Sequence, residues 1–169
     1  RIAAIINRLK PDIAALQEID VKTKRASGAD QAAILAELTG LDYTFGRAID
    51  YDSGQYGLAI LSRFEMRDVT NTPLPTQPGS EPRIALAARI RLESEPKEIL
   101  FVDTHLCHRS NEVRKMQTTS LGEFARTAGD VPVILAGDFN ARPTSEPMNV
   151  LLESDWLDAI APKSRIDYV

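Results

Sequence analysis

The chain has 169 residues, of which 43% are hydrophobic and 26% charged, a balance that predicts one globular domain with a hydrophobic core. The formal net charge of −4 argues against a general binder of nucleic acid or anionic membranes. A single cysteine, Cys107, excludes an internal disulfide framework. No apolar run is long enough to span a membrane, and no charged-then-apolar leader opens the chain.

The first part of the chain alternates between helical and extended patterns. Helical spacing of apolar residues predicts helices over 2–9 and 30–38, which end at Pro11 and Gly40 respectively. Short apolar runs predict strands over 13–16, 43–49, 57–62 and 66–74, the last more exposed than the others, with a polar turn over 50–54. The first of these strands places Glu18 just beyond its carboxyl end.

The second part of the chain begins with a loop over 72–82, which contains four prolines. An alternating pattern over 83–92 predicts a strand that opens with Arg83 and has one apolar side. A buried strand over 99–102 leads into Asp103-Thr104-His105. Helices follow over 112–127, where Met116 is among the residues expected on the buried face, and over 148–152.

Between those two helices lies an apolar run over 131–136, rich in β-branched residues, which is typical of a strand buried on both faces. Gly137 then frees the backbone, and Asp138 and Asn140 follow at a spacing of two. In an extended segment this spacing puts both side chains on one face, where they can bind and activate water. Asp and Asn also cap turns and helices, so these residues alone leave both interpretations open.

Many strands with a few helices between them predict a layered α/β domain with mixed sheets. Three of the predicted strands end in polar residues: Glu18, then Thr104 and His105, then Asp138 and Asn140. Ligand sites of α/β sheets gather at the carboxyl ends of strands. Three such ends with complementary chemistry therefore indicate a functional site.

The chemistry of these groups favours one reaction class. Glu18 offers a hard oxygen ligand of the kind that Mg²⁺ prefers, and His105 can donate a hydrogen bond to a charged oxygen. Asp138 can orient or deprotonate water, and Asn140 can hold that aspartate or a phosphate oxygen. The alternatives are an exposed charge at Glu18 and a structural histidine at His105. No zinc-ligand spacing, Gly-x-Ser-x-Gly or Walker-type loop is present. Metal-assisted attack of water on a phosphoester uses all four groups.

These residues lie in motifs that resemble the endonuclease/exonuclease/phosphatase superfamily of metal-dependent phosphoesterases. The motifs follow the family's order: Leu16-Gln17-Glu18, Ala59-Ile60-Leu61-Ser62-Arg63, Asp103-Thr104-His105-Leu106, Gly137-Asp138-Phe139-Asn140 and Arg165-Ile166-Asp167-Tyr168-Val169. The segment 20–62, with its Gly54-Gln55-Tyr56-Gly57 turn, is most similar to uncharacterised bacterial hydrolases of this superfamily. The resemblance implies an α/β (α+β) four-layer sandwich, in which two mixed β-sheets pack face to face with helices outside, over one domain spanning 1–169.

The resemblance also implies roles for the core of the site. It places Mg²⁺ or Mn²⁺ on Glu18 and a phosphate contact on His105. Asp138 would position or activate water, with Asn140 in support. Asp167 matches the family position that orients a catalytic histidine further along the chain.

The remaining candidates are substrate contacts. His108, with Arg114 and Gln117, fits the family's extension of the His-Leu strand into the following helix. Arg83 is a weaker candidate for a phosphate contact, with a solvated strand-end arginine as its alternative. Cys107 stands where related sequences often have Asp, which predicts that a local hydrogen bond is missing.

The family's first strand, which bears an asparagine, and its last Ser-Asp-His strand have no counterpart in these residues. We therefore expect a domain truncated at both ends. If the 169 residues were the entire molecule, they would be poorly active and would expose two sheet edges.

The function predicted is divalent-metal-dependent hydrolysis of phosphoester bonds, in particular phosphodiesters. The alternatives are a catalytically inactive binding module of the same fold, and a nuclease rather than a small-molecule or lipid phosphodiesterase. The partner expected is therefore a phosphoester substrate, whether a small molecule, a lipid headgroup or nucleic acid. The sequence indicates no obligate protein partner, leaves the oligomeric state open, and is compatible with a cytoplasmic or a secreted bacterial protein.

Overall fold

The computed structural model describes residues 1–93, 98–153 and 156. Asp167 and the rest of the motif over 165–169 lie outside these residues. The elements, in chain order, are α1 (Ile2–Leu9), β1 (Ile13–Val21), α2 (Gln31–Thr39), β2 (Asp42–Tyr51), β3 (Gly54–Ser62), β4 (Met66–Pro73), β5 (Ile84–Arg91), β6 (Glu98–His105), α3 (Asn111–Arg126), β7 (Val133–Asp138) and α4 (Glu146–Leu152). Over the described part of the chain, none of the helices is long and apolar enough to cross a membrane.

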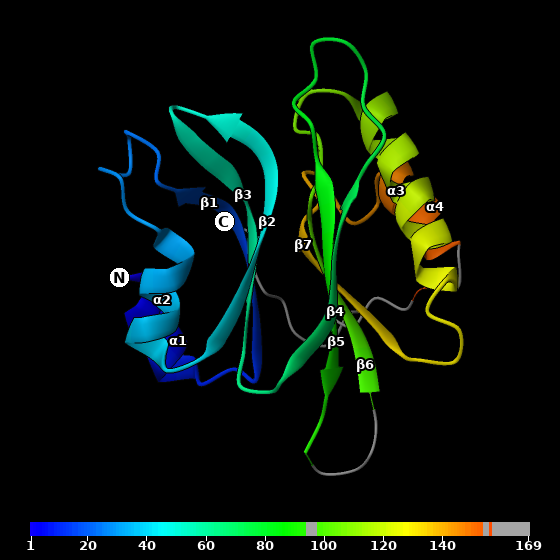
Figure 1. Cartoon of the computed structure of the whole chain (residues 1–169). Helices are drawn as coiled ribbons and strands as arrows, with labels where there is room; N and C mark the ends of the chain where they lie inside the picture. Colours follow the sequence, from blue (N-terminus) through cyan, green and yellow to red (C-terminus); the bar gives the residue numbers. More distant parts are fainter. Residues whose placement is uncertain (94–97, 154–155, 157–169) are drawn as a thin grey trace.

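The strands form two sheets that pack face to face between two pairs of helices (Figure 1). Sheet A has the order β1-β3-β2 and is antiparallel throughout the described residues. Sheet B has the order β4-β5-β6-β7 and is mixed, because β6 and β7 run parallel. Helices α1 and α2 cover the outer face of sheet A, and α3 and α4 cover that of sheet B. The predicted four-layer arrangement is confirmed.

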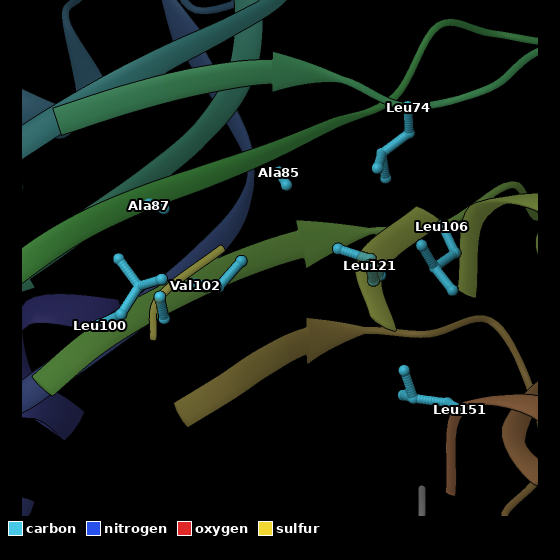
Figure 2. Packing of buried hydrophobic residues seen from close by; sticks show 9 residues of the cluster. Leu74, Ala85, Ala87, Leu100, Val102, Leu106, Leu121 and Leu151 are labelled. Atoms are coloured by element: carbon cyan, nitrogen blue, oxygen red, sulfur yellow. The ribbon is translucent and has the colours of Figure 1, made fainter. Parts of the chain in front are cut away.

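Each interface between layers has its own hydrophobic core. Between the sheets lie buried side chains from both of them: Leu58, Ile60, Ile84, Leu86, Ala88, Ile90, Ile99 and Phe101. A second core joins α1 and α2 to sheet A. The third core joins sheet B to α3 and α4, and Figure 2 shows Leu100 and Val102 of β6 on the same side as Leu121 and Leu151.

Strand β5 differs from its predicted form because it lies inside the sheet, between β4 and β6. The alternation predicted one apolar side, yet both faces are buried. Ile84 and Leu86 face sheet A, while Ala85 and Ala87 pack toward α3 and α4. Alanine is small enough to let the helices approach this face. Because the buried residues here are alanines, the alternation in the sequence did not indicate that the second face is buried as well.

Two other predictions of burial are wrong. Strand β7 pairs only with β6 in the described part of the chain, and Ile134 is 46% exposed, so this strand is not buried on both faces. On α3, Met116 is 39% exposed, and the polar residues Gln117 and Thr118 are fully buried. The helical spacing of apolar residues predicted the wrong buried face for α3, because two of the residues that are buried on this helix are polar.

The predicted turn over 50–54 is confirmed as the connection between β2 and β3, where Tyr51 pairs with Gly54. Its two central residues, Asp52 and Ser53, have φ of 49° and 67°. A two-residue hairpin with positive φ at both central positions matches the right-handed twist of the strands. The hairpin sets the register between β2 and β3. On the other side of β3, Tyr56 and Gly57 pair with β1.

Candidate functional site

The predicted polar residues meet at one end of the sandwich, where β6 and β7 finish side by side. In the parallel register His105 pairs with Asp138, the last residue of each strand. His105 Nε2 lies 3.7 Å from Asp138 Oδ2. This is too long for a direct hydrogen bond, so both groups remain available to a third partner.

Gly137 allows the two strands to finish this close together. Its φ is +143°, and a Cβ atom at this position would lie 2.0 Å from the carbonyl oxygen of Thr104 on β6. No side chain fits there without moving the backbone. The glycine of the Gly-Asp-Phe-Asn motif is thus required by packing against the strand that carries His105.

Asn140 forms a turn rather than extending the strand. Its φ is 47°, and its backbone N–H donates to Asp138 Oδ1 at 2.8 Å. Its side-chain Nδ2 donates to the carbonyl of Leu106 at 2.9 Å. The turn-capping interpretation is therefore correct in geometry, and the expected extended pair on one face is not observed. The turn occupies Oδ1 of Asp138 and leaves Oδ2 facing His105.

Glu18 is not beyond a strand end, as predicted, but inside β1. Leu16 pairs with Ala59 and Ile19 pairs with Gly57, so Gln17 and Glu18 together oppose one residue of β3. This is a β-bulge, and Glu18 has a φ of 60°. Left-handed backbone at a non-glycine residue is strained and is common at functional sites.

The bulge decides which way Glu18 faces. Before it, Ala14 and Leu16 pack with the helices of sheet A; after it, Ile19 does so. In a regular strand Glu18 would share that face with Leu16. The extra residue shifts the alternation, and the carboxylate of Glu18 acts electrostatically on His105 and Tyr56 instead.

Arg83 immediately precedes β5 and is buried, with 4% of its surface exposed. The alternative of a solvated arginine is therefore wrong. Its Nη1 lies 2.9 Å from His105 Nδ1 and 3.0 Å from Glu81 Oε1, and its Nη2 lies 3.4 Å from His108 Nδ1. The Nε atom has no hydrogen-bond partner among the residues that the structure describes. Arg83 thus joins the two histidines of the site.

Burial and the contact with Arg83 both favour the neutral form of His105, and the contact sets its tautomer. Burial lowers the pKa of His105, and the positive charge of Arg83 lowers it further, against the opposing effect of Asp138 and Glu18. An arginine has only donors, so Nδ1 of His105 must accept. The imidazole is then neutral with its proton on Nε2, which faces Asp138.

His108 lies between two arginine donors. Nη2 of Arg83 approaches its Nδ1 at 3.4 Å, and Nε of Arg109 approaches its Nε2 at 3.2 Å. A neutral imidazole has one acceptor nitrogen, so it satisfies one of these donors at a time. Its role in substrate binding stays a prediction.

The loop after β6 is held by side chains of α3. Gln117 Oε1 accepts from the Cys107 backbone N–H at 2.9 Å, and Arg114 Nη1 donates to the Cys107 carbonyl at 2.6 Å. Burial raises the pKa of the Cys107 thiol, but the N–H groups of Ser110 and Arg109, the side chain of Ser80 and the charge of Arg83 together lower it more, so the net pKa is lowered. The loop at the Asp-to-Cys replacement is therefore secured by other hydrogen bonds.

Tyr56 is a member of the site that the sequence did not indicate beyond its place in a turn. It is 9% exposed, and burial and the charge of Glu18 raise the pKa of its hydroxyl, while the positive charge of Arg83 opposes them. Its partners lie on β1 and before β5, far away in the sequence. The sequence feature that could have indicated Tyr56 is its position next to Gly57 in a buried strand.

The donors present suit a hard divalent cation. Glu18 is an exposed carboxylate without an ion pair in the described residues. Across those residues, no three His, Cys, Asp or Glu side chains gather as a ready-made cage. Mg²⁺ typically takes one or two protein carboxylates and keeps waters for the rest, so Glu18 fits such an ion.

This chain is similar to known proteins in sequence and in fold. The model of the "Endonuclease/Exonuclease/phosphatase family" matches residues 1–169. Protein angel of Drosophila melanogaster is 30% identical over 159 residues, covering 86% of this chain and 43% of that protein. The uncharacterised protein YbhP of Escherichia coli K12 is 29% identical over 143 residues, covering 80% of this chain and 56% of that protein.

This chain is also similar in fold to a solved structure. The mannosyl-6-phosphatase Bt3783 of Bacteroides thetaiotaomicron superposes with a TM-score of 0.75 at 21% identity, covering 90% of this chain and 60% of that one. This chain thus spans about half the length of the curated relatives it matches. With its family match over the whole sequence, the chain belongs to the Endonuclease/Exonuclease/phosphatase family.

Proposed function

We propose that the protein is a divalent-metal-dependent phosphoester hydrolase that acts through Glu18, His105 and Asp138, with phosphodiesters as its preferred substrates. The proposal rests on the family membership, on the phosphatase relative, and above all on the charge of the site. In the described part of the site, three carboxylates, Glu18, Glu81 and Asp138, lie close enough to His105 to raise its pKa, and one buried guanidinium, that of Arg83, opposes them.

This excess of negative charge is the main argument for the proposal. His105 adds no positive charge because it is neutral, and Arg83 is already paired with Glu81 at 3.0 Å. A phosphate anion would be repelled by such a site unless a cation joined it. Glu18 would hold Mg²⁺ or Mn²⁺, which would supply that charge and polarise the phosphoryl group.

The other side chains have complementary tasks. His105 presents its Nε2–H to a non-bridging phosphate oxygen as a neutral donor. Asp138 uses Oδ2 to orient and deprotonate the attacking water, while its Oδ1 is held by the Asn140 N–H. Asn140 ties this turn to the loop after β6 through the Leu106 carbonyl. This link fixes the distance between Asp138 and His105.

The charge balance also bears on the substrate. A phosphodiester carries one negative charge, whereas a monoester carries between one and two at neutral pH. With few cationic side chains in the site, the singly charged diester is the better match.

The test is hydrolysis of bis-p-nitrophenyl phosphate and p-nitrophenyl phosphate by the full-length protein with Mg²⁺, Mn²⁺ or EDTA. We expect turnover that needs the metal, is faster with the diester, and falls about 10²- to 10⁴-fold in the Asp138→Ala variant. Asp42→Ala, at the exposed start of β2, is the matched control and should retain the wild-type rate.

Two results would contradict the proposal. Metal-dependent turnover that persists in Asp138→Ala would remove Asp138 from the reaction. Absence of both turnover and Mn²⁺ binding in the full-length wild-type protein would instead support an inactive binding module. Cleavage of oligonucleotides but not of the small diester would favour a nuclease.

A further inference from the structure

Something must hold the bulge of β1, because a regular strand would avoid the left-handed backbone of Glu18. Residues 13, 15 and 17 of β1 face sheet B, as Ile13 and Ala15 show by packing in the core between the sheets. Gln17 is the last of this series, and it is a polar residue on an otherwise apolar face. Its partner must therefore come from the opposite sheet.

That partner is Asp103 of β6. Gln17 Nε2 donates to Asp103 Oδ1 at 2.7 Å, which joins residues that are 86 positions apart in the sequence. Asp103 is fully buried, and within the described residues its other carboxyl oxygen, Oδ2, has no hydrogen-bond partner. The side chain of Gln17, which is a residue of the bulge itself, is thus held by one residue of sheet B.

Asp103 is built into the strand that carries His105. The two residues are two positions apart on β6, and with Phe101 they lie on the face turned toward sheet A. A hydrogen bond from Gln17 to Asp103 therefore fixes the bulge relative to His105. It couples the two sheets at the position where each contributes a polar group to the site.

We propose that Gln17 and Asp103 are a positioning pair: their hydrogen bond between the sheets maintains the bulge of β1 and thereby directs Glu18 into the site rather than toward α1 and α2. The inference concerns the conformation of Glu18, and it rests on the proposed function only for the claim that Glu18 holds a metal. Neither residue touches substrate in this proposal. Both act through the direction of the Glu18 carboxylate.

The experiment compares two disrupting and two preserving variants of the full-length protein. Gln17→Leu removes the donor, and Asp103→Leu removes the acceptor at similar volume. Asp103→Asn retains an acceptor oxygen for Gln17. Thr104→Val is the matched control, because it removes a buried hydroxyl of the same strand that bonds to Ile84 within sheet B and does not reach β1.

Two readouts separate positioning from general stability. The first is the ¹³Cα chemical shift of Glu18, which differs between left-handed and extended backbone. The second is the dissociation constant for Mn²⁺ from an electron paramagnetic resonance titration. We expect the two disrupting variants to shift Glu18 toward extended values and to weaken Mn²⁺ binding about 10- to 100-fold, whereas Asp103→Asn and Thr104→Val stay near wild type.

The inference is overturned if Gln17→Leu leaves the Glu18 shift and the Mn²⁺ affinity unchanged, or if Thr104→Val alters them equally. Gln17 is only half-buried, so Gln17→Leu still decides the question if Asp103→Leu fails to fold. A wild-type protein that binds no Mn²⁺ would contradict the proposed function, while the Glu18 shift would still test the positioning pair.

Discussion

Arg83 donates a hydrogen bond from Nη1 to Nδ1 of His105 across 2.9 Å, inside a buried part of the site. The two residues are 22 positions apart: Arg83 immediately precedes β5, and His105 ends β6, the neighbouring strand of sheet B. Because arginine stays protonated and has no acceptor, the contact specifies the tautomer of the imidazole. The histidine is held as a neutral donor through Nε2.

This relationship predicts the state of His105 in solution. Long-range ¹H–¹⁵N spectra of the imidazole should show a neutral ring with its proton on Nε2 at pH 7. The chain has two histidines, so His108 serves as an internal reference whose assignment follows directly. A ring of His105 protonated on Nδ1, or on both nitrogens, would contradict the prediction.

Removing the guanidinium should make His105 easier to protonate. Burial is the main cause that lowers its pKa and persists in Arg83→Met, but the repulsion from Arg83 is gone and Asp138 and Glu18 remain. We expect the pKa from an NMR titration to be higher in the variant than in wild type. Arg114→Met is the matched control, because Arg114 bonds to the Cys107 carbonyl and does not contact His105. A pKa that is unchanged or lower in Arg83→Met would be inconsistent with this account.

Asp103 should make stability depend on pH. Burial raises its pKa well above the usual range, against the hydrogen bond from Gln17. Above about pH 4 the unfolded chain releases this proton while the folded chain keeps it, so the free energy of unfolding falls as pH rises, by about 1.4 kcal/mol per pH unit until the folded pKa is reached. Asp103→Asn lacks this loss.

The measurement is urea-induced unfolding of wild type and Asp103→Asn at several pH values between 4.5 and 7. The free energy of unfolding of the variant, relative to wild type, should increase with pH. Asp42→Asn, at an exposed position, should show a constant difference. A difference for Asp103→Asn that is constant or decreases with pH would mean that the carboxyl group is ionised in the folded protein.

Gly137→Ala should be among the most damaging single substitutions. The added Cβ would lie 2.0 Å from the Thr104 carbonyl oxygen, which belongs to the backbone of β6 and cannot rotate away. We expect a loss of at least about 4 kcal/mol in the free energy of unfolding, or no folded protein. Gly129→Ala, at φ +66° with no atom within 4 Å, should cost about 1 kcal/mol. Equal losses for the two variants would show that crowding at Gly137 is relieved.

Much of the fold follows from local patterns, because periodicity and turn residues act over a few neighbouring positions. The helix over 30–38 is capped by Asp30, which accepts from the Ala33 N–H, and is followed by Gly40 at φ 70°. The same kind of local reasoning fails for β7. Its apolar composition indicated burial on both faces, but exposure depends on which strands lie beside it.

The candidate site shows the same division. Glu18, His105, Asp138 and Asn140 were predicted as candidates from strand ends and from the order of the family motifs, and the structure brings them together at one end of the sandwich. For Glu18 the strand-end argument was wrong, because this residue lies inside β1. Tyr56 and Glu81 were missed, because their part in the site comes from contacts with Arg83.

By itself the sequence determined the element types, the layered architecture and the order of the chemical groups, since these depend on short-range patterns of apolar and polar residues. Only the tertiary structure decided which way Glu18 faces and where the proton of His105 resides. The first depends on the bulge and on a hydrogen bond between Gln17 and Asp103, 86 residues apart. The second depends on Arg83, a buried donor that immediately precedes β5. Strict alternation would have placed Glu18 under the helices; contacts between distant residues place it in the site.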